Sequence, residues 1–313
     1  MAEVRGTRDG YGEALLQLGK ENNRIAVVDA DLFRSTRTDA FAEAFPERFF
    51  EIGIAEQDMV STAAGLAVGG MIPFANSFAV FITGRAFDQT RQQVALAGLN
   101  VKLAGSSAGI TQGPDGATHQ SVLDVALMRS LPNMCVVVPS DPEEAKLATR
   151  AAAEREGPVY LRLSRYETPV WRDPAQPFEI GRAEVRRAGA DVTIAASGVL
   201  LGRVLEAAEK LSGAGISAEV LNVHTVKPLD VGAVVDSCRR TGSVVTVEEG
   251  SIIGGLGSAV AEVLAETAGQ HIPLKRMGVA DTFGESGTAD ELLEKHGLTV
   301  DNIAATAQAL ARL

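Results

Sequence analysis

Hydrophobic residues in the first half of the chain gather in short runs rich in valine and isoleucine, which longer segments rich in alanine and leucine separate. Nearly continuous apolar runs of this length are typical of parallel strands that are buried on both faces of a sheet. We therefore predict an α/β domain over residues 1–168 with helices on both faces of a parallel sheet. Its predicted strands are 25–29, 49–54, 72–75, 101–104, 135–139 and 159–163, and its predicted helices are 10–21, 57–68, 84–97, 122–130 and 143–156.

The alternation stops at residues 166–177, which hold three prolines, the single tryptophan and charges of both signs. Proline-rich stretches of mixed charge are typical of connections, so we predict a linker over 169–184. The alternation then begins again and predicts a second, smaller α/β domain over 185–313. Its predicted strands are 192–196, 217–223 and 243–247, and its predicted helices are 203–212, 230–239 and 258–268.

Composition narrows the classes of protein. The formal net charge of −11 argues against a nucleic-acid or anionic-membrane surface. No apolar run approaches the roughly 18 residues of a membrane span, and the N-terminus lacks an apolar signal core. Two cysteines, Cys135 and Cys238, form neither a disulfide framework nor a zinc ligand set. We expect a cytoplasmic protein with no metal site of its own.

A glutamate stands where a predicted strand passes into a predicted helix, in the segment 53–59. A carboxylate in a first helical turn often does no more than interact favourably with the helix dipole. The neighbours of Glu56 are small or apolar, however, which indicates a partly buried carboxyl group. Such a group could share a proton with a heterocycle nitrogen, and Glu56 is our first candidate for a catalytic residue.

Two further segments carry candidate chemistry. Phe78 and Phe81 could pack in the core or could form a flat slot for a ring system. By default, Arg85 belongs to a helix-surface set of ion pairs with Asp88 and Arg91. The loop 109–119 is rich in glycine, which lets the backbone approach a ligand, and it ends in one of four histidines, His119. A lone loop histidine is usually solvated, so its role stays open at this point.

Two glycine-containing segments resemble known motifs by chance. Residues 105–109 match G-x-S-x-G around Ser107, but a loop rich in glycine and proline follows instead of the helix that a nucleophile elbow requires. Residues 254–257 lie between a predicted strand and helix, but they do not fit the dinucleotide-binding pattern. A serine hydrolase built on Ser107 and a non-catalytic scaffold remain the alternatives from other classes.

The segments 53–59 and 113–120 resemble the two signature segments of the C-terminal half of transketolase, a thiamine diphosphate enzyme. Further matches are 30–32, 131–134, 139–141 and 157–165, so the resemblance covers nearly the whole chain. It implies a three-layer αβα pyrimidine-binding domain followed by a smaller α/β transketolase C-terminal domain.

The resemblance also implies roles at the cofactor. Glu56 matches the glutamate that hydrogen-bonds the aminopyrimidine ring and thereby favours the form that deprotonates the thiazolium carbon. Phe78 and Phe81 match the aromatic pocket around the pyrimidine, and Asp31 matches a residue near the thiazolium at a subunit contact. We assign Ile54 and Arg85 to the same cofactor site.

At the substrate, Asp115 and His119 match residues that recognise hydroxyl and carbonyl groups of a ketose, and we count His119 as catalytic. Arg8, Ser35 and Arg165 match the site for the sugar-phosphate end. Many transketolases carry a histidine where this chain has Ser107. The phosphate site would then lose a positive charge, so an unphosphorylated, shorter or unusual acceptor is plausible.

One expected part is missing. The family's N-terminal half supplies a Gly-Asp-Gly segment for magnesium and diphosphate, and this chain has none. We therefore expect a subunit that transfers a two-carbon ketol unit only with an N-terminal-type partner, as an α₂β₂ assembly in which Mg²⁺ is bound through that partner. The alternatives in the same fold family are the beta subunit of a 2-oxoacid or acetoin dehydrogenase and a deoxyxylulose-phosphate synthase. The segment from Asp115 to His119 favours ketol transfer because it suits polyhydroxylated substrates.

Overall fold

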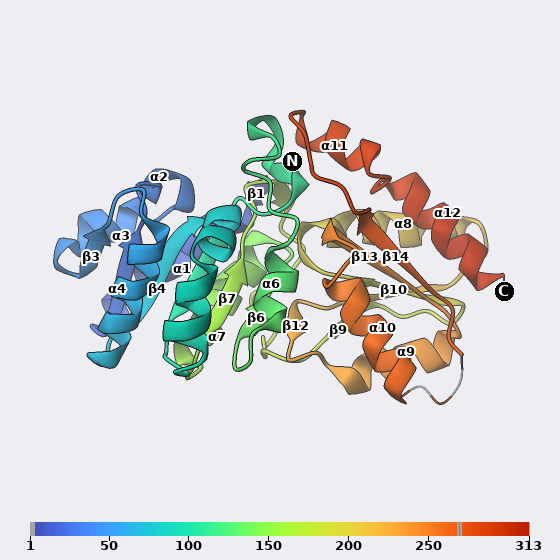
Figure 1. The fold of residues 1–313 in the computed structure, drawn as a ribbon. Coiled ribbons are helices and arrows are strands. Elements are labelled where there is room, and N and C mark those ends of the chain that lie inside the picture. Colours follow the sequence, from blue (N-terminus) through green and yellow to red (C-terminus); the bar gives the residue numbers. More distant parts are fainter. Residues whose placement is uncertain (1–3, 268, 270, 313) are drawn as a thin grey trace.

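A seven-stranded sheet forms the centre of the first domain (Figure 1). The computed structural model describes residues 4–267, 269 and 271–312. Six strands of the sheet are parallel to one another, and β12, which comes from much later in the chain, pairs antiparallel with β6 at the edge. In spatial order the strands are β12 (Thr225–Lys227), β6 (Cys135–Val137), β7 (Val159–Arg162), β5 (Lys102–Ser106), β4 (Ile72–Phe78), β2 (Ile25–Asp29) and β3 (Phe49–Glu51).

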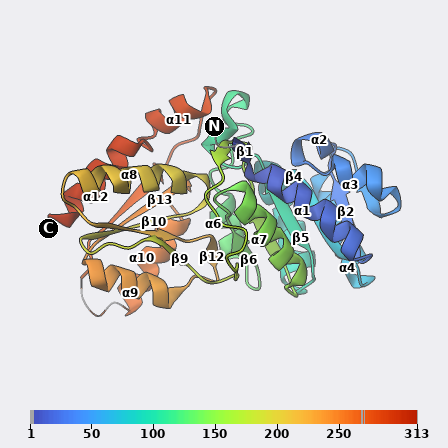
Figure 2. The ribbon, with the colours of Figure 1, turned by 180° about the vertical axis from the view of Figure 1, so that it is seen from behind.

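Helices cover both faces of this sheet, which confirms the predicted three layers. On one face, α1 (Thr7–Glu21) and α7 (Pro142–Glu154) lie side by side (Figure 2). They bury the side chains of Tyr11, Leu15 and Ala148. On the other face, α4 (Glu56–Val68), α6 (Asp124–Ser130) and the segment 81–95 enclose a second apolar cluster. Strands buried from both sides explain why the apolar runs in the sequence are nearly continuous.

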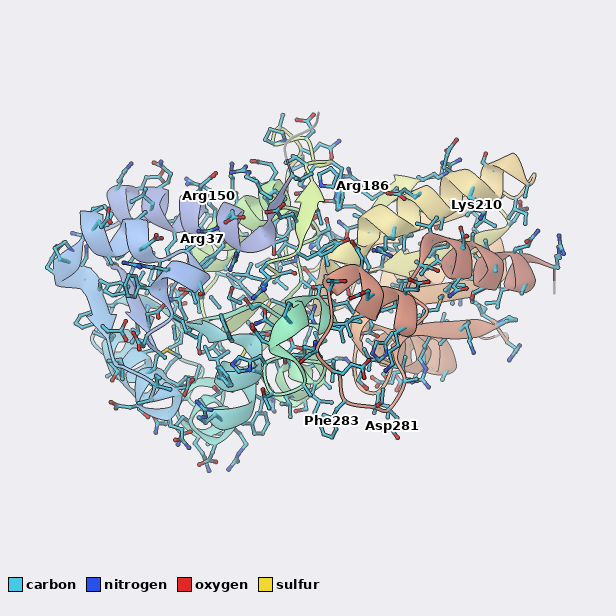
Figure 3. All side chains as sticks on the ribbon, turned by 90° about the horizontal axis from the view of Figure 1, so that it is seen from above. Arg37, Arg150, Arg186, Lys210, Asp281 and Phe283 are labelled. Carbon is cyan, nitrogen blue, oxygen red and sulfur yellow. The ribbon has the colours of Figure 1, made fainter. Side chains whose placement is uncertain are left out.

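The second domain repeats this arrangement around a five-stranded sheet. Its strands in spatial order are β14 (Leu274–Val279), β13 (Val244–Ser251), β10 (Val192–Ala196), β11 (Ala218–Asn222) and β9 (Glu184–Arg187), of which only β9 is antiparallel. One face carries α8 (Leu201–Gly213), α11 (Ala289–Lys295) and α12 (Val300–Ala311), and the other carries α9 (Val231–Thr241) and α10 (Leu256–Thr267). The loop between β14 and α11 brings Asp281 and the exposed Phe283 to the outer rim (Figure 3).

The predicted continuous helix over 84–97 is wrong. The segment instead consists of the π-helical turn η2 (Phe81–Arg85), the short helix α5 (Phe87–Gln89) and the π-helical turn η3 (Thr90–Ala95). In η2 the hydroxyl of Thr83 donates to the carbonyl of Ala79 at 2.6 Å, which competes with regular helical bonding. Turns of this type often occur at functional sites.

Several predicted boundaries move by a few residues. The strand predicted over 49–54 ends at Glu51, because Gly53 adopts a positive φ of 74°. The helix predicted over 258–268 begins at Leu256, and its predicted end at Ala268 lies outside the described residues, as do the outermost residues 1–3 and 313 of the predicted domains. Five elements of the second half have no sequence prediction, namely β9, β12, β14, α11 and α12. The short elements of the chain that were also not predicted are β1 (Val4–Gly6), β8 (Glu167–Pro169), α2 (Phe33–Thr36), α3 (Asp39–Ala44), η1 (Pro46–Arg48), η4 (Ile110–Asp115) and η5 (Gly198–Leu200).

The segment between the two domains forms hydrogen bonds and ion pairs with both of them. Strand β8 pairs with β1, and the carboxylate of Asp141 accepts hydrogen bonds from the backbone of Trp171 and Arg172. The buried guanidinium of Arg172 contacts Glu144 of the first domain at 3.0 Å and Glu184 of the second at 2.8 Å. Together with β12, these contacts join the two domains through buried polar groups. In the part of the chain that the structure describes, no helix is long and apolar enough to cross a membrane.

Candidate active site

The parallel strands of the first sheet end at one edge, and most of the predicted site residues follow these ends. In parallel α/β sheets, ligands bind outside the carboxyl ends of the strands. Arg8, in the first turn of α1, reaches the same edge, where its backbone N–H donates to the carbonyl of Ser164 at 3.2 Å. Asp31 follows β2, Ile54 and Glu56 follow β3, Phe78 ends β4 with Phe81 behind it, Ser107, Asp115 and His119 follow β5, and Arg165 follows β7.

Glu56 is the first residue of α4 and is 1% exposed, although a carboxylate normally remains in water. Arg85 compensates for this burial, since its Nη1 lies 2.6 Å from Oε2 of Glu56 while its side chain remains 45% exposed. The default assignment of Arg85 to a set of surface ion pairs with Asp88 and Arg91 was therefore wrong. Of that set, Arg91 and Asp88 pair with each other, at 3.3 Å. Among the described residues, no further hydrogen bond to the Glu56 carboxylate is formed.

An aromatic wall lies next to this ion pair. The rings of Phe78 and Phe81 stack with centroids 6.0 Å apart and planes inclined by 17°. The imidazole of His119 presents its edge to both rings, at 5.2 Å from Phe81 and 6.2 Å from Phe78. The guanidinium of Arg85 lies 4.7 Å from the centroid of Phe81. The structure thus brings these four residues and Glu56 into one cluster, although they come from separate segments.

The residues predicted at the anionic end of a substrate also come together. Arg8 Nη1 donates to the carbonyl of Ser35 at 3.1 Å, and Arg165 Nη1 lies 3.3 Å from Oδ2 of Asp115. Burial lowers the pKa of Arg8, and the positive charges of Arg37 (labelled in Figure 3) and Arg165 lower it further. The carboxylates of Asp9 and Glu167 act in the opposite direction. An anion beside Arg8 would reduce the repulsion among the three guanidinium groups.

Asp31 and Ile54 lie at the exposed outer part of the same edge. Glu51, a residue that the sequence did not single out, joins the two segments that carry them. Its Oε1 accepts the N–H of Asp31 at 2.8 Å and that of Gly53, next to Ile54, at 2.9 Å. Ile54 is one of the most exposed large apolar side chains of the chain.

A buried aspartate holds the turn that carries Asp31 and Ser35. Asp29 accepts the N–H of Leu32 at 2.7 Å and the hydroxyls of Thr36 at 2.8 Å and Thr38 at 3.0 Å. Burial raises the pKa of Asp29 to about 6, although these hydrogen bonds oppose the shift. Sequence reasoning missed Asp29 because it reads as the last residue of an apolar strand.

The two motif-like segments do not form the sites that their patterns suggest. Ser107 has a positive φ of 53°, but its hydroxyl is buried and bonds no group among the described residues, so no histidine activates it. In the glycine turn 254–257, the carboxylate of Glu248 accepts the N–H of Leu256 at 2.9 Å and that of Gly257 at 2.8 Å. This carboxylate occupies the position in which a phosphate would bind.

Three buried polar residues that the sequence analysis missed support the loop that carries Asp115 and His119. Gln112 and Gln120 lie within the loop, and the Nε2 of Gln120 donates to the carbonyls of Gly113 at 3.0 Å and Glu285 at 2.8 Å. Glu249 of the second domain packs beneath Gly109, where an added Cβ would lie 2.0 Å from its Oε1. Burial raises the pKa of Glu249 to about 7. The glycine-rich loop itself was the only signal that could have directed attention to them.

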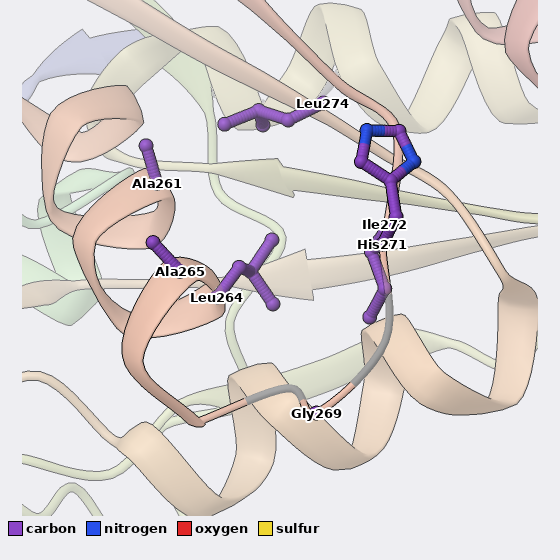
Figure 4. Close-up of a pocket in the computed structure, with 7 residues that line it drawn as sticks. All are labelled: Ala261, Leu264, Ala265, Gly269, His271, Ile272 and Leu274. Carbon is purple, nitrogen blue, oxygen red and sulfur yellow. The ribbon is translucent and has the colours of Figure 1, made fainter.

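Two features elsewhere carry no chemistry of their own. Glu144, Glu184 and His224 bring ligand atoms together, but Arg172 already pairs with both carboxylates and Arg186 with that of Glu184, and burial lowers the pKa of His224 to about 4. A pocket in the second domain is lined mainly by aliphatic side chains of α10, of the segment before β14 and of the first residue of β14 (Figure 4). Neither resembles a catalytic site.

Comparison with known families matches both domains. Residues 4–170 match the transketolase pyrimidine-binding domain, and residues 181–303 match the transketolase C-terminal domain. A Methanocaldococcus jannaschii protein provisionally named transketolase C-terminal section is 48% identical over 96% of this chain and 94% of its own length. A 6-deoxy-6-sulfo-D-fructose transketolase subunit from a Clostridium species is 46% identical over 96% of this chain and 93% of its own.

Solved structures agree with these matches. A structure described as a split gene transketolase, inactive β4 tetramer, is 48% identical, covers 99% of both chains and superposes with a TM-score of 0.90. Transketolase from Leishmania mexicana is 27% identical with a TM-score of 0.82 over all of this chain, which spans 46% of that enzyme. The 1-deoxy-D-xylulose-5-phosphate synthase of Symbiobacterium thermophilum is 41% identical over 96% of this chain, which spans 46% of its length.

Proposed function

The chain belongs to the transketolase family, and we propose that it is the C-terminal subunit of a split transketolase, which transfers a two-carbon ketol unit from a ketose to an aldose acceptor. The observation that carries this proposal is the cluster of Glu56, Arg85, Phe78, Phe81 and His119. A buried carboxylate beside a flat aromatic wall suits an aromatic heterocycle with a basic nitrogen.

The residues of this cluster fit the pyrimidine half of thiamine diphosphate. Phe78 and Phe81 supply a planar apolar surface, and Glu56 supplies a buried carboxylate that is paired with the half-exposed Arg85. When bound, this cofactor supplies the stabilised carbanion that the protein cannot make from its own side chains. Glu56 would hold a proton at the ring nitrogen, and His119, beside the aromatic wall, would act on the oxygen atoms of the substrate. We assign Asp31 and Ile54, at the open edge, to the side of the cofactor that faces the partner.

The far end of the substrate would lie at the cationic corner formed by Arg8 and Arg165, with Ser35 beside Arg8. We propose a ketose whose far end carries an anion, either a phosphate or, as the name of the Clostridium relative suggests, a sulfonate. Guanidinium groups bind either anion through paired hydrogen bonds. Ser107 is buried and uncharged, so the arginines would bind this anion without help from that position.

The subunit holds half of the site that such a reaction requires. We propose that an N-terminal-type subunit binds the diphosphate and Mg²⁺, and that two copies of each subunit form an α₂β₂ enzyme. The description of the related β4 tetramer as inactive supports a requirement for a second kind of subunit. Because Cys135 and Cys238 are buried and unpaired, we place the enzyme in a reducing compartment, the cytoplasm.

Reconstitution tests the proposal. The chain and the product of a neighbouring gene with a Gly-Asp-Gly segment are purified separately and assayed singly and mixed, with thiamine diphosphate, Mg²⁺, a ketose phosphate or sulfonate and an aldose. We expect ketol transfer from the mixture and none from either protein alone. Transfer by the isolated chain at the rate of the mixture would contradict the split site.

Identity to the Symbiobacterium synthase favours one second candidate, a deoxyxylulose-phosphate synthase. The same mixture distinguishes the two reactions when pyruvate replaces the ketose as donor. Carbon dioxide release from pyruvate with glyceraldehyde 3-phosphate as acceptor would support the synthase. Ketol transfer from the ketose, together with no carbon dioxide release from pyruvate, would support transketolase.

A further inference from the structure

We infer that Gln112 is a positioning residue that orients the carboxylate of Asp115 and thereby sets the preference for aldehydes that carry a hydroxyl group next to the carbonyl. This inference rests on the proposed ketol transfer, in which Asp115 meets hydroxyl groups of the substrate. It concerns a residue whose side chain is 0% exposed and that does not itself touch the substrate.

Two donors, from Gln112 and Arg165, face the same carboxylate oxygen of Asp115. Gln112 lies three residues before Asp115 in η4, and its Nε2 donates to Oδ2 of Asp115 at 2.5 Å. Arg165 Nη1 lies 3.3 Å from the same Oδ2. Among the described residues, no donor bonds Oδ1, and the Asp115 side chain is 42% exposed. Protein donors therefore fix Oδ2 of Asp115, while Oδ1 remains available to a substrate hydroxyl.

The backbone of this loop is fixed without Gln112. Gln120 bonds the carbonyl of Gly113 and also Glu285 of the second domain. Gly113 and Gly116 both have positive φ values, of 78° and 76°. Because other residues determine the path of the loop, the loss of the Gln112 amide should change the direction of the Asp115 side chain more than the fold.

The amide also keeps Asp115 from a bidentate pair with Arg165, which contacts only Oδ2. A carboxylate beside a guanidinium tends to turn both oxygens toward it in a bidentate pair. Without the donor from Gln112, Asp115 would be free to do so and would withdraw Oδ1 from the substrate. Gln112 thus allows Asp115 to recognise hydroxyls while Arg165 remains available to the anionic end.

The test compares two acceptors in the reconstituted enzyme, with hydroxypyruvate as the common donor. Glyceraldehyde carries the hydroxyl next to its carbonyl, and propanal lacks it. For Gln112→Met we expect KM for glyceraldehyde to rise about 10-fold, in line with the loss of a hydrogen bond to a charged group. The kcat with glyceraldehyde should stay within about twofold of the wild-type value. The kcat/KM for propanal should also stay within about twofold of the wild-type value, because propanal makes no bond to Asp115.

A pH profile separates orientation from packing. In Gln112→Glu the new carboxyl group has the shape of the amide, and in its protonated form it can donate to Asp115 as the amide does. We expect the glyceraldehyde preference of this variant to approach that of the wild type at low pH and to be lost as pH rises, when two carboxylates repel. Gln112→Met should lack this pH dependence, and Gln17→Met, on the exposed face of α1, should behave as the wild type.

Each outcome decides the inference. Equal losses with glyceraldehyde and propanal, or an unchanged preference in both Gln112 variants, would refute the positioning role. If Gln112→Met fails to fold, the acid rescue of Gln112→Glu decides in its place. A wild-type mixture without ketol transfer would instead refute the proposed function, and the positioning role with it.

Discussion

At the scale of single residues, the most consequential feature is the carboxylate of Glu56, which is buried at the start of a helix and paired with the half-exposed Arg85. If it holds a proton at the cofactor ring, then Glu56→Gln in the reconstituted enzyme should lower kcat by at least about 100-fold, which is the low end for a lost acid–base group. The unfolding midpoint should change little, since the amide has the same shape. The control is Asp58→Asn, which changes an exposed carboxylate in the same turn of α4 and should retain activity.

A second carboxyl group makes stability depend on pH. The pKa of Glu249 is raised from 4.5 to about 7 by burial, so the folded state retains a proton that the unfolded chain loses above pH 4.5. Its contribution to stability is complete below pH 4.5 and is lost as pH rises through 7. We expect Glu249→Gln to gain stability over the wild type between pH 5 and 8, by up to about 3 kcal/mol. Denaturant unfolding of both proteins across this range checks it; a difference that does not vary with pH would contradict it.

At the scale of elements, the loop that carries Asp115 and His119 depends on the glycine that enters it. Gly109 combines a positive φ with a Cβ position that the Glu249 side chain fills. Gly98 has a positive φ of 63° but open space around its Cβ position. Gly98→Ala should therefore cost about 1 kcal/mol for its backbone alone, and Gly109→Ala should cost at least about 2 kcal/mol more. Equal losses for the two variants in urea unfolding would show that Glu249 does not fill this space.

The sequence predicted elements well wherever the apolar pattern alone decides them. The strands 25–29 and 192–196 end where the structure ends them, because both are buried on each face. The pattern failed over 84–97, where periodicity cannot register the extra residue of a π-helical turn. It also could not detect β12, whose partner β6 lies about ninety residues earlier in the sequence.

The candidate site shows the same limit. Signature segments identified Glu56 and His119, and the aromatic pair was noted with its alternative as core. The partner of Glu56 was missed because an arginine on a predicted helix reads as a surface residue, and nothing local indicates a contact 29 residues away. Glu51 bonds the N–H of Asp31 from the neighbouring strand, and Glu249 packs against Gly109 from the second domain, so both contacts form only when separate segments meet. The partners of Asp29 and Gln112 lie within nine residues in the sequence, but the apolar pattern says nothing about bonds between polar side chains.

At the scale of the whole molecule, buried polar contacts between the domains fix the second domain beneath the substrate loop. Arg172 pairs with one glutamate from each domain, so Arg172→Met leaves the buried Glu144 without its cation and leaves Glu184 with Arg186 at 3.5 Å. We expect a loss of about 3–5 kcal/mol in unfolding free energy. Arg182→Met removes an exposed pair with Glu179 in the same segment and should cost less than about 1 kcal/mol. Similar losses for both variants would show that Arg172 does not join the domains.

The central claim is that this subunit holds the aromatic end of the cofactor while a second subunit binds its diphosphate. Calorimetric titration of thiamine diphosphate, in the presence of Mg²⁺, into the chain alone, the partner alone and their mixture tests it most directly. We predict saturable binding to the mixture that is at least about 100-fold tighter than to either protein alone, because each one holds only part of the ligand. Binding to the isolated chain with the affinity of the mixture would contradict the claim.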